Sequence, residues 1–159
     1  MSMDLLAADP LIGNNFFLEI DGEVISHLSA VDGLAIELEK MEINQRTAKG
    51  VLVQHVAYSK PKLTGELTVK RLSPLDSSSD PLWTWFNEIR DKGMSVAKRL
   101  GNRKNGSVVI YDTSMIEVAR WNFMGAWPNK IASDGFDVTK NEPVAETITF
   151  QYESLTRVK

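Results

Sequence analysis

Arg120-Trp121-Asn122-Phe123-Met124-Gly125-Ala126-Trp127-Pro128-Asn129-Lys130 is the stretch of sequence that decides the fold class. Trp121 and Trp127 are six positions apart, so on a β-strand they point to the same side as Phe123 between them. The alternating positions are mostly polar, and we expect them to face water or another chain. We expect Pro128 to end the strand, because proline lacks the N–H that a sheet ladder needs. The stretch therefore predicts a structural strand with one buried aromatic face and no catalytic residue.

The composition of the chain is that of an ordinary globular protein. It has 159 residues, of which 43% are hydrophobic and 25% charged, and it has no cysteine. This length predicts one domain that covers residues 1–159. The lack of cysteine excludes disulfides, thiol nucleophiles and thiolate metal sites. A net charge of −3 argues against sequence-specific binding of nucleic acid through a basic surface.

The N-terminal segment, residues 1–11, does not have the pattern of a secretory signal. It carries two aspartates, no basic region and no long apolar run. The sequence also contains no run of about 18 apolar residues, the length that a membrane-spanning helix requires. We therefore expect synthesis in the cytoplasm.

Several turns and alternating segments predict antiparallel strands. Asp21-Gly22 is typical of a two-residue β-hairpin turn. Residues 34–58 consist of two apolar arms around a polar centre at residues 44–50, which predicts a long protruding hairpin. Asn105-Gly106 predicts another turn. Residues 144–153 predict the last strand, with an apolar face that is interrupted only by a glutamate.

One helix is predicted over residues 81–92. Asp80 is placed to cap it, and Pro81 suits its first position. The apolar residues at helical spacing are Leu82, Trp85, Phe86 and Ile89. Many strands and one helix predict a mainly β fold, either a β-sandwich or a β-barrel of two packed antiparallel sheets with one flanking helix.

The sequence contains no pattern that selects an active site. His27, Ser29 and Asp32 resemble a hydrolytic triad only in composition, since no nucleophile elbow accompanies them, and a strand-end histidine beside a turn is the favoured interpretation. Asp134 and Asp137 resemble an acidic calcium loop but lack its later oxygen ligands, so a turn is favoured there. We predict no enzyme, no cofactor and no metal site. Two other functions stay open at this point. One is a small monomeric β-barrel module that binds a ligand, and the other is a hydrolase whose catalytic carboxylates no sequence motif identifies.

Segments that occur in the same order in a known protein family run through nearly the whole chain. The most specific are Arg120-Trp121-Asn122-Phe123 and Ala126-Trp127-Pro128 with Lys130. The others are Asp9-Pro10-Leu11-Ile12-Gly13-Asn14-Asn15-Phe16, Glu19-Ile20-Asp21-Gly22, Ser29-Ala30-Val31-Asp32-Gly33-Leu34, Leu67-Thr68-Val69-Lys70-Arg71, Leu82-Trp83-Thr84-Trp85-Phe86, Asn105-Gly106-Ser107-Val108-Val109 and Glu146-Thr147-Ile148-Thr149-Phe150. With these segments the chain resembles the inner tube proteins of contractile injection systems and the tail tube proteins of contractile phages, which are related in fold to the Hcp ring protein of type VI secretion.

The resemblance implies a structural role in a phage-tail-like particle. In that family six-subunit rings stack into a hollow conduit, which sheath contraction drives into the target and which carries cargo. The implied partners are further copies of the chain, the contractile sheath protein, baseplate and tube-initiator or spike proteins, and effector cargo in the lumen. The resemblance also implies that the protein is synthesised in the bacterial cytoplasm and then assembled into the particle.

Two surfaces are the candidate sites for such a role. We expect the hairpin to contact a neighbouring subunit or ring, because a lone projection with apolar arms is unstable in water. Its candidate contact residues are Ile43, Asn44, Gln45, Arg46, Lys49, Val51 and Val53. We expect small polar and acidic side chains to line a lumen that releases its cargo. The candidate lumen residues are Thr64, Glu66, Thr68, Thr147, Thr149 and Gln151.

Overall fold

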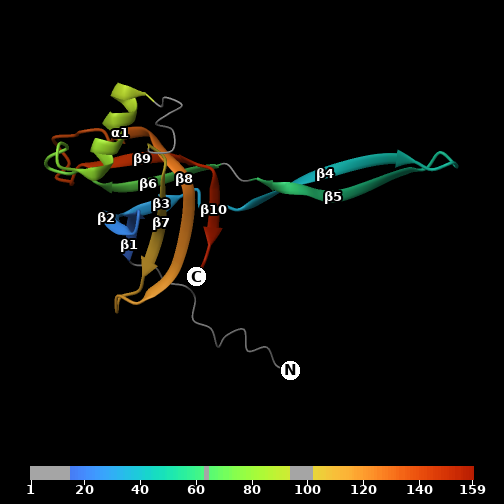
Figure 1. Cartoon of the computed structure of the whole chain (residues 1–159), viewed down its shortest axis with the longest axis horizontal. Helices are drawn as coiled ribbons and strands as arrows, with labels where there is room; N and C mark the ends of the chain where they lie inside the picture. The colour runs from blue at the N-terminus through green and yellow to red at the C-terminus, as the bar shows by residue number, and fades with distance from the viewer. Residues whose placement is uncertain (1–14, 63–64, 94–101) are drawn as a thin grey trace.

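Strands dominate the computed structural model, which describes residues 15–62, 65–93 and 102–159 (Figure 1). The strands are β1 (Asn15–Ile20), β2 (Glu23–Leu28), β3 (Ala30–Asp32), β4 (Glu37–Arg46), β5 (Leu52–Lys62), β6 (Gly65–Leu72), β7 (Lys104–Tyr111), β8 (Glu117–Ser133), β9 (Ala145–Tyr152) and β10 (Ser154–Arg157). Within the described ranges the flanking helix is α1 (Pro81–Lys92). The mainly β fold with a flanking helix is therefore confirmed for these residues.

The larger sheet curls until its two ends are joined by the chain itself. Its strand order is β2-β1-β7-β8-β9-β6-β3, with β10 paired to β8, and the pairings are antiparallel. Strands β2 and β3 lie at opposite ends of this order, yet only Ser29 separates them in the sequence. The Ser29 N–H donates a hydrogen bond to the carbonyl of Lys70 on β6, at 2.8 Å. This connection closes the barrel.

Strand β8 belongs to both halves of the barrel, because its early residues pair with β7 and β10 and its late residues pair with β9. The two halves enclose a core in which the rings of Phe123 and Phe150 stack, with centroids 6.2 Å apart. The other buried side chains of this core are Leu18, Ile20, Leu28, Leu67, Val69, Leu82, Trp85, Val108, Ala126, Ile148 and Tyr152. Together with Phe123 and Phe150 they make up the buried core of the barrel.

Helix α1 has the predicted bounds, and its N-terminus is capped as expected. The Asp80 side chain accepts a hydrogen bond from the Trp83 N–H, and Pro81 occupies the first turn. Gly93 ends the helix with a positive φ of 64°. Trp85 is buried, and its Nε1 donates to the Asn102 carbonyl at 2.7 Å. The helix is thereby fixed to the barrel.

The prediction that Pro128 ends its strand is wrong. Pro128 is buried and lies opposite Phe150, and the register shifts directly after it, which accommodates its missing N–H. Gly125 has a positive φ of 63°, and beyond it Ala126 takes a buried position. Trp127 is therefore only partly buried, although it still packs against the core.

The turn predicted at Asp21-Gly22 is present, and both residues have the positive φ that it requires. Two other expectations, about a turn and about the last strand, need correction. Asn105 and Gly106 lie inside β7 rather than in a turn. A Cβ on Gly106 would lie 2.5 Å from the Glu19 carbonyl oxygen and 2.5 Å from the Phe123 ring, so glycine is required there by close packing. The strand over residues 144–153 is not the last, because β10 follows it and pairs with β8.

Candidate assembly surfaces

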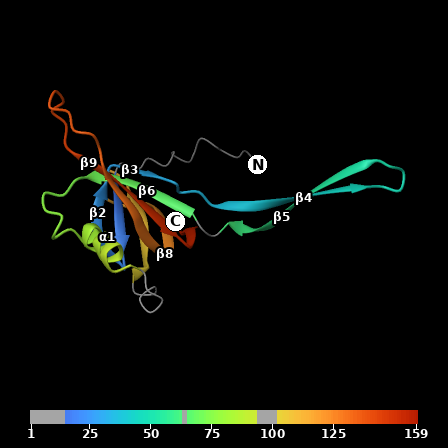
Figure 2. The same cartoon turned by 90° about the horizontal axis from the view of Figure 1, so that it is seen from above.

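The predicted hairpin is present, and it projects away from the barrel (Figure 2). Strands β4 and β5 form a two-stranded sheet of their own. Its turn is held by Thr47, whose N–H donates to the Val51 carbonyl and whose side-chain oxygen accepts from the Val51 N–H. The hairpin therefore holds its shape through its own ladder and turn, without packing of the kind that stabilises the barrel.

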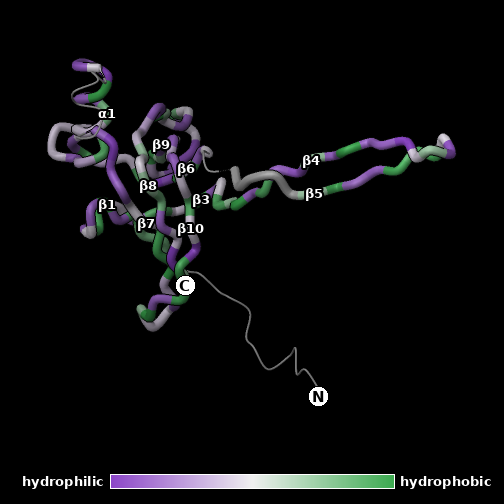
Figure 3. The backbone as a smooth tube through the Cα atoms, turned by 45° about the vertical axis from the view of Figure 1, so that its right-hand side comes forward, coloured by the Kyte–Doolittle hydropathy of each residue, from purple (hydrophilic) through white to green (hydrophobic). Residues whose placement is uncertain are grey.

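The hairpin exposes apolar side chains along its length, and all ten residues of β4 are exposed. Figure 3 shows apolar and polar positions alternating along both arms. The large exposed apolar side chains of this segment are Ile36, Leu38, Met41, Ile43, Val51, Leu52 and Val56. An isolated two-stranded hairpin is marginally stable in water, so a hairpin of this composition needs a covering surface.

The cross-strand register divides the candidate contact residues between the two faces of the hairpin. Ile43 lies opposite His55, and Gln45 lies opposite Val53, on the face that also carries Met41. The other face carries the pairs Glu42–Val56, Asn44–Gln54 and Arg46–Leu52. Lys49 and Val51 belong to the turn region at the tip. All seven candidates thus lie on the outer half of the hairpin, on more than one of its surfaces.

The candidate lumen residues are brought together by the pairing of β6 with β9. Glu66 lies opposite Gln151, and Thr68 lies opposite Thr149. The Gln151 Nε2 donates to Glu66 Oε2 at 3.1 Å. Thr147 continues the same face of β9. Thr64 lies outside the described residues.

This polar face is uneven in exposure. Glu66 is exposed and Thr68 is half-buried, but Thr149 retains only 9% of its surface because its neighbours on β6 and β8 flank it. Lys70, on the same face, forms an ion pair with Asp134 at 2.8 Å. Small polar groups and paired charges therefore make up most of the face.

A buried ionic network connects β6, β9 and α1 inside the barrel. Arg71 donates to both carboxylate oxygens of Asp80, at 2.8 and 2.7 Å, and from Nε to Glu146 at 2.8 Å. Trp83 donates its Nε1–H to the other oxygen of Glu146. Burial alone would raise the pKa of Asp80, but the hydrogen bonds from Arg71 and the Trp83 N–H hold that pKa below its usual value.

The sequence carried only one sign of this network, which was the glutamate that interrupts the apolar face of β9. Glu146 is 1% exposed, so its charge must be compensated inside the protein. Its partner Arg71 comes from the adjacent strand, and Asp80 comes from the helix cap. Nothing in the spacing of these residues indicates that the chain brings them together.

The residues that resemble a catalytic triad or a calcium loop have structural partners. The Ser29 hydroxyl donates to the Lys70 carbonyl, Asp32 accepts from the Gly33 N–H, and His27 packs on an aromatic ring. Asp137 accepts from the backbone and hydroxyl of Thr139, as in a turn. Within the described ranges no cluster of three or more potential metal ligands occurs.

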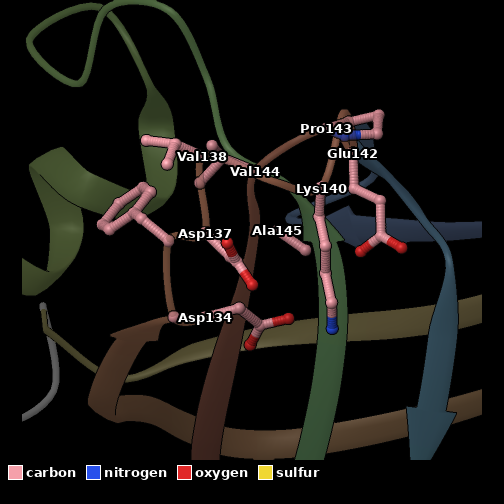
Figure 4. A pocket seen from close by; sticks show the side chains of 10 residues that line it. Asp134, Asp137, Val138, Lys140, Glu142, Pro143, Val144 and Ala145 are labelled. Carbon is pink, nitrogen blue, oxygen red and sulfur yellow. The ribbon is translucent and has the colours of Figure 1, made fainter.

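The loop between β8 and β9 surrounds an open hollow on the surface (Figure 4). Apolar and acidic side chains both line it. The lining residues are Asp134, Gly135, Phe136, Asp137, Val138, Lys140, Glu142, Pro143, Val144 and Ala145. In the part of the chain that the structure describes, no helix is long and apolar enough to cross a membrane.

The arrangement of barrel, helix and hairpin agrees with the comparison to known families. The family model for the T4-like virus tail tube protein gp19 matches residues 13–156. The chain belongs to this tail tube family. It is therefore a structural tube subunit.

Solved structures of such particles contain chains with the same fold. A chain of the PVC sheath–tube complex of an extracellular contractile injection system, in its extended state, has a TM-score of 0.70 at 19% identity, with coverage of 99% of this chain and 97% of that one. A chain of the PVC sheath/tube terminator has a TM-score of 0.71 at 18% identity, with coverage of 96% and 99%.

A chain in the 6-fold symmetrised baseplate of the anti-feeding prophage has a TM-score of 0.67 at 14% identity, with coverage of 95% of this chain and 97% of that one. No curated protein sequence matches the chain. At these identities the solved structures establish the fold, and the family match establishes the membership.

Proposed function

We propose that six copies of this chain form a ring, and that such rings stack into the hollow tube of a contractile particle. The observation that carries this proposal is the β4–β5 hairpin, which projects from the barrel with apolar side chains exposed on it. The 6-fold symmetrised baseplate that contains a chain of the same fold supports the ring number. Ring closure also lets weak subunit contacts act together, since the last subunit completes two interfaces.

The hairpin is the proposed contact between neighbouring subunits or rings. Burial of its exposed apolar side chains, at about 25 cal/mol per Å² of apolar surface, stabilises the stacked form over the separate ring. The contact residues proposed for its outer half are Ile43, Asn44, Gln45, Arg46, Lys49, Val51 and Val53. In a single molecule all of these residues except the partly buried Val53 are exposed.

The polar face of β6 and β9 is the proposed lumen wall. Its residues are Glu66, Thr68, Thr147, Thr149 and Gln151, with Thr64 as the member outside the described part. Polar groups that already bond one another, as the Gln151 amide does to the Glu66 carboxylate, bind passing cargo weakly. A wall of this kind suits a conduit.

The proposed partners are the sheath, the baseplate, the tube-initiator or spike proteins and the cargo. Chains of the same fold occur in a sheath–tube complex and in a baseplate, which supports the first two. The chain is proposed to act without catalysis, as a structural subunit of the tube that sheath contraction drives into the target. It is proposed to be made in the bacterial cytoplasm and then built into the particle.

Electron microscopy of the purified protein tests the proposal directly. Intact protein at high concentration is expected to form rings or stacked tubes. A variant without residues 44–50 is expected to remain folded and soluble but not to stack, because it lacks the tip of the hairpin. Val24→Ser, which changes an exposed apolar residue of the barrel, serves as the control. Isolated monomers at every concentration would refute the proposal.

A further inference from the structure

Two loops form the end of the barrel that points away from the hairpin. One connects β6 to α1 and the other connects β8 to β9, and Figures 1 and 2 both show them on the side opposite to β4 and β5. Their bases are joined, because the Ser73 N–H donates to the Val144 carbonyl at 2.9 Å. We call residues 73–79 and 134–144 together the loop end.

The loop end exposes large apolar side chains. Leu75 and Val138 are fully exposed, and Phe136 is 77% exposed. Val144 is exposed beside them, and Val138 and Val144 lie near one another at the hollow in Figure 4. Phe136, Val138 and Val144 line the same hollow, and large apolar side chains exposed together indicate a surface that another molecule covers.

The charged side chains of the loop end are mainly acidic. Asp76, Asp134, Asp137 and Glu142 lie in these loops, against the single basic side chain of Lys140. Three of the acidic side chains line the hollow together with the apolar ones. The loop end therefore combines an apolar surface with an excess of negative charge.

The tip of the hairpin has the complementary character. Arg46 and Lys49 give residues 44–52 two positive charges and no negative one. Val51 and Leu52 are exposed beside them. A basic, apolar projection thus lies at one end of the molecule, and an acidic, apolar hollow lies at the other.

We propose that the loop end receives the hairpin tip of another copy of this chain. The inference rests on the proposed stacking of rings and names the surface that the hairpin meets. Because the two surfaces lie at opposite ends of one molecule, the hairpin tip of a copy cannot bind its own loop end. Each copy therefore has one hairpin tip and one hollow available for contacts with other copies. Such a head-to-tail contact does not close between two molecules but continues from ring to ring.

Cysteine cross-linking tests the contact directly, because the chain has no cysteine of its own. A variant with both Lys49→Cys and Glu142→Cys is assembled into tubes, oxidised and separated without reductant. The expected product is a ladder of dimers, trimers and longer species, since each copy is linked to a copy on either side. Each single variant is expected to give no ladder. Dimers from Lys49→Cys alone would show that tips meet tips and would overturn the inference.

Removal of apolar surface from the loop end provides a second test, because it weakens the free energy of stacking. Phe136→Ala is expected to raise the protein concentration needed for stacking by about tenfold, from the loss of one buried aromatic side chain. Ile116→Ala is the control, because Ile116 is 61% exposed in another loop. An equal effect of the two substitutions, or no effect of Phe136→Ala, would overturn the inference.

Charge exchange gives a third, independent measurement. Lys49→Glu is expected to raise the stacking concentration about two- to fivefold, because it places like charges together at a solvent-exposed rim. Addition of Glu142→Lys is expected to restore the original value. If tubes form normally, give no cross-links in the double cysteine variant and are unaffected by the Phe136 and Lys49 substitutions, the loop-end contact is refuted. The proposed function would not be refuted by that result. The absence of rings and tubes altogether would refute the proposed function and with it the contact.

Discussion

The Nη2 atom of Arg71 lies 2.6 Å from Oε1 of Glu146, inside the barrel, where these side chains are only 4% and 1% exposed. The same guanidinium binds Asp80, which caps α1. One arginine therefore holds two strands and the start of the helix together. Buried charges of this kind are tolerated only when each has its partner.

Removal of the arginine should be strongly destabilising. Arg71→Met leaves two buried carboxylates without their cation, and we expect a loss of about 3–5 kcal/mol in the free energy of unfolding. For a chain of this length this corresponds to a fall in Tm of roughly 10 °C, measured by circular dichroism. Arg120→Met is the control, because Arg120 binds Glu19 and Glu117 at a site that still reaches solvent, with 26% of the Arg120 side chain exposed. That substitution should cost about 1 kcal/mol. Equal losses of unfolding free energy in Arg71→Met and Arg120→Met would contradict a special role for the buried network.

The lowered pKa of Asp80 predicts a dependence of stability on acid. Its ionised form is favoured by folding, so its contribution is complete above the ordinary pKa of 3.8 and is lost as the pH falls through the lower folded value. Asp80→Asn keeps a good capping residue but removes the charge. The stability difference between wild type and this variant should be constant at neutral pH and shrink below about pH 4. Glu88→Gln, at an exposed position of α1, is the control for general charge effects.

The close approach of β7 to β1 and β8 predicts intolerance of a methyl group. Gly106→Ala places a Cβ within 2.5 Å of the Glu19 carbonyl oxygen, and we expect a cost of about 1–3 kcal/mol in urea unfolding. Gly135→Ala is the matched control, because a Cβ there meets nothing within 4 Å. Neither glycine has a positive φ, so the comparison isolates packing. Similar midpoints for both variants would contradict the close contact between these strands.

The proposed lumen wall predicts protection of Glu66 in tubes. Glu66→Cys is expected to react quickly with a bulky maleimide in the separate subunit, where this position is exposed, and much more slowly in assembled tubes. Thr149 is a poorer probe, because it is already 9% exposed in the single chain. Glu88→Cys is the control, since α1 packs on the opposite, inward side of β9 through Trp85 and Phe150. Equal reaction of Glu66→Cys in tubes and subunits would count against this face as the wall.

The sequence patterns predicted the elements whose causes are local. Asp80, Pro81 and the apolar spacing after them predicted α1 with its correct bounds, because capping and helical periodicity act within a few residues. Asp21-Gly22 predicted its turn for the same reason. The errors lie at Pro128 and Gly106, whose roles depend on strands that are distant in the sequence.

By itself the sequence determined the class of the protein, its helix, its projecting hairpin and the alternation of β6 and β9, since these follow from side-chain periodicity and turn chemistry over short distances. Only the tertiary structure decided that Glu66 lies directly opposite Gln151, that Arg71 meets Glu146 and Asp80, and that the hairpin and the loop end lie at opposite ends. Strand order and register bring those residues together, and they result from the burial of one common core, which no local pattern records.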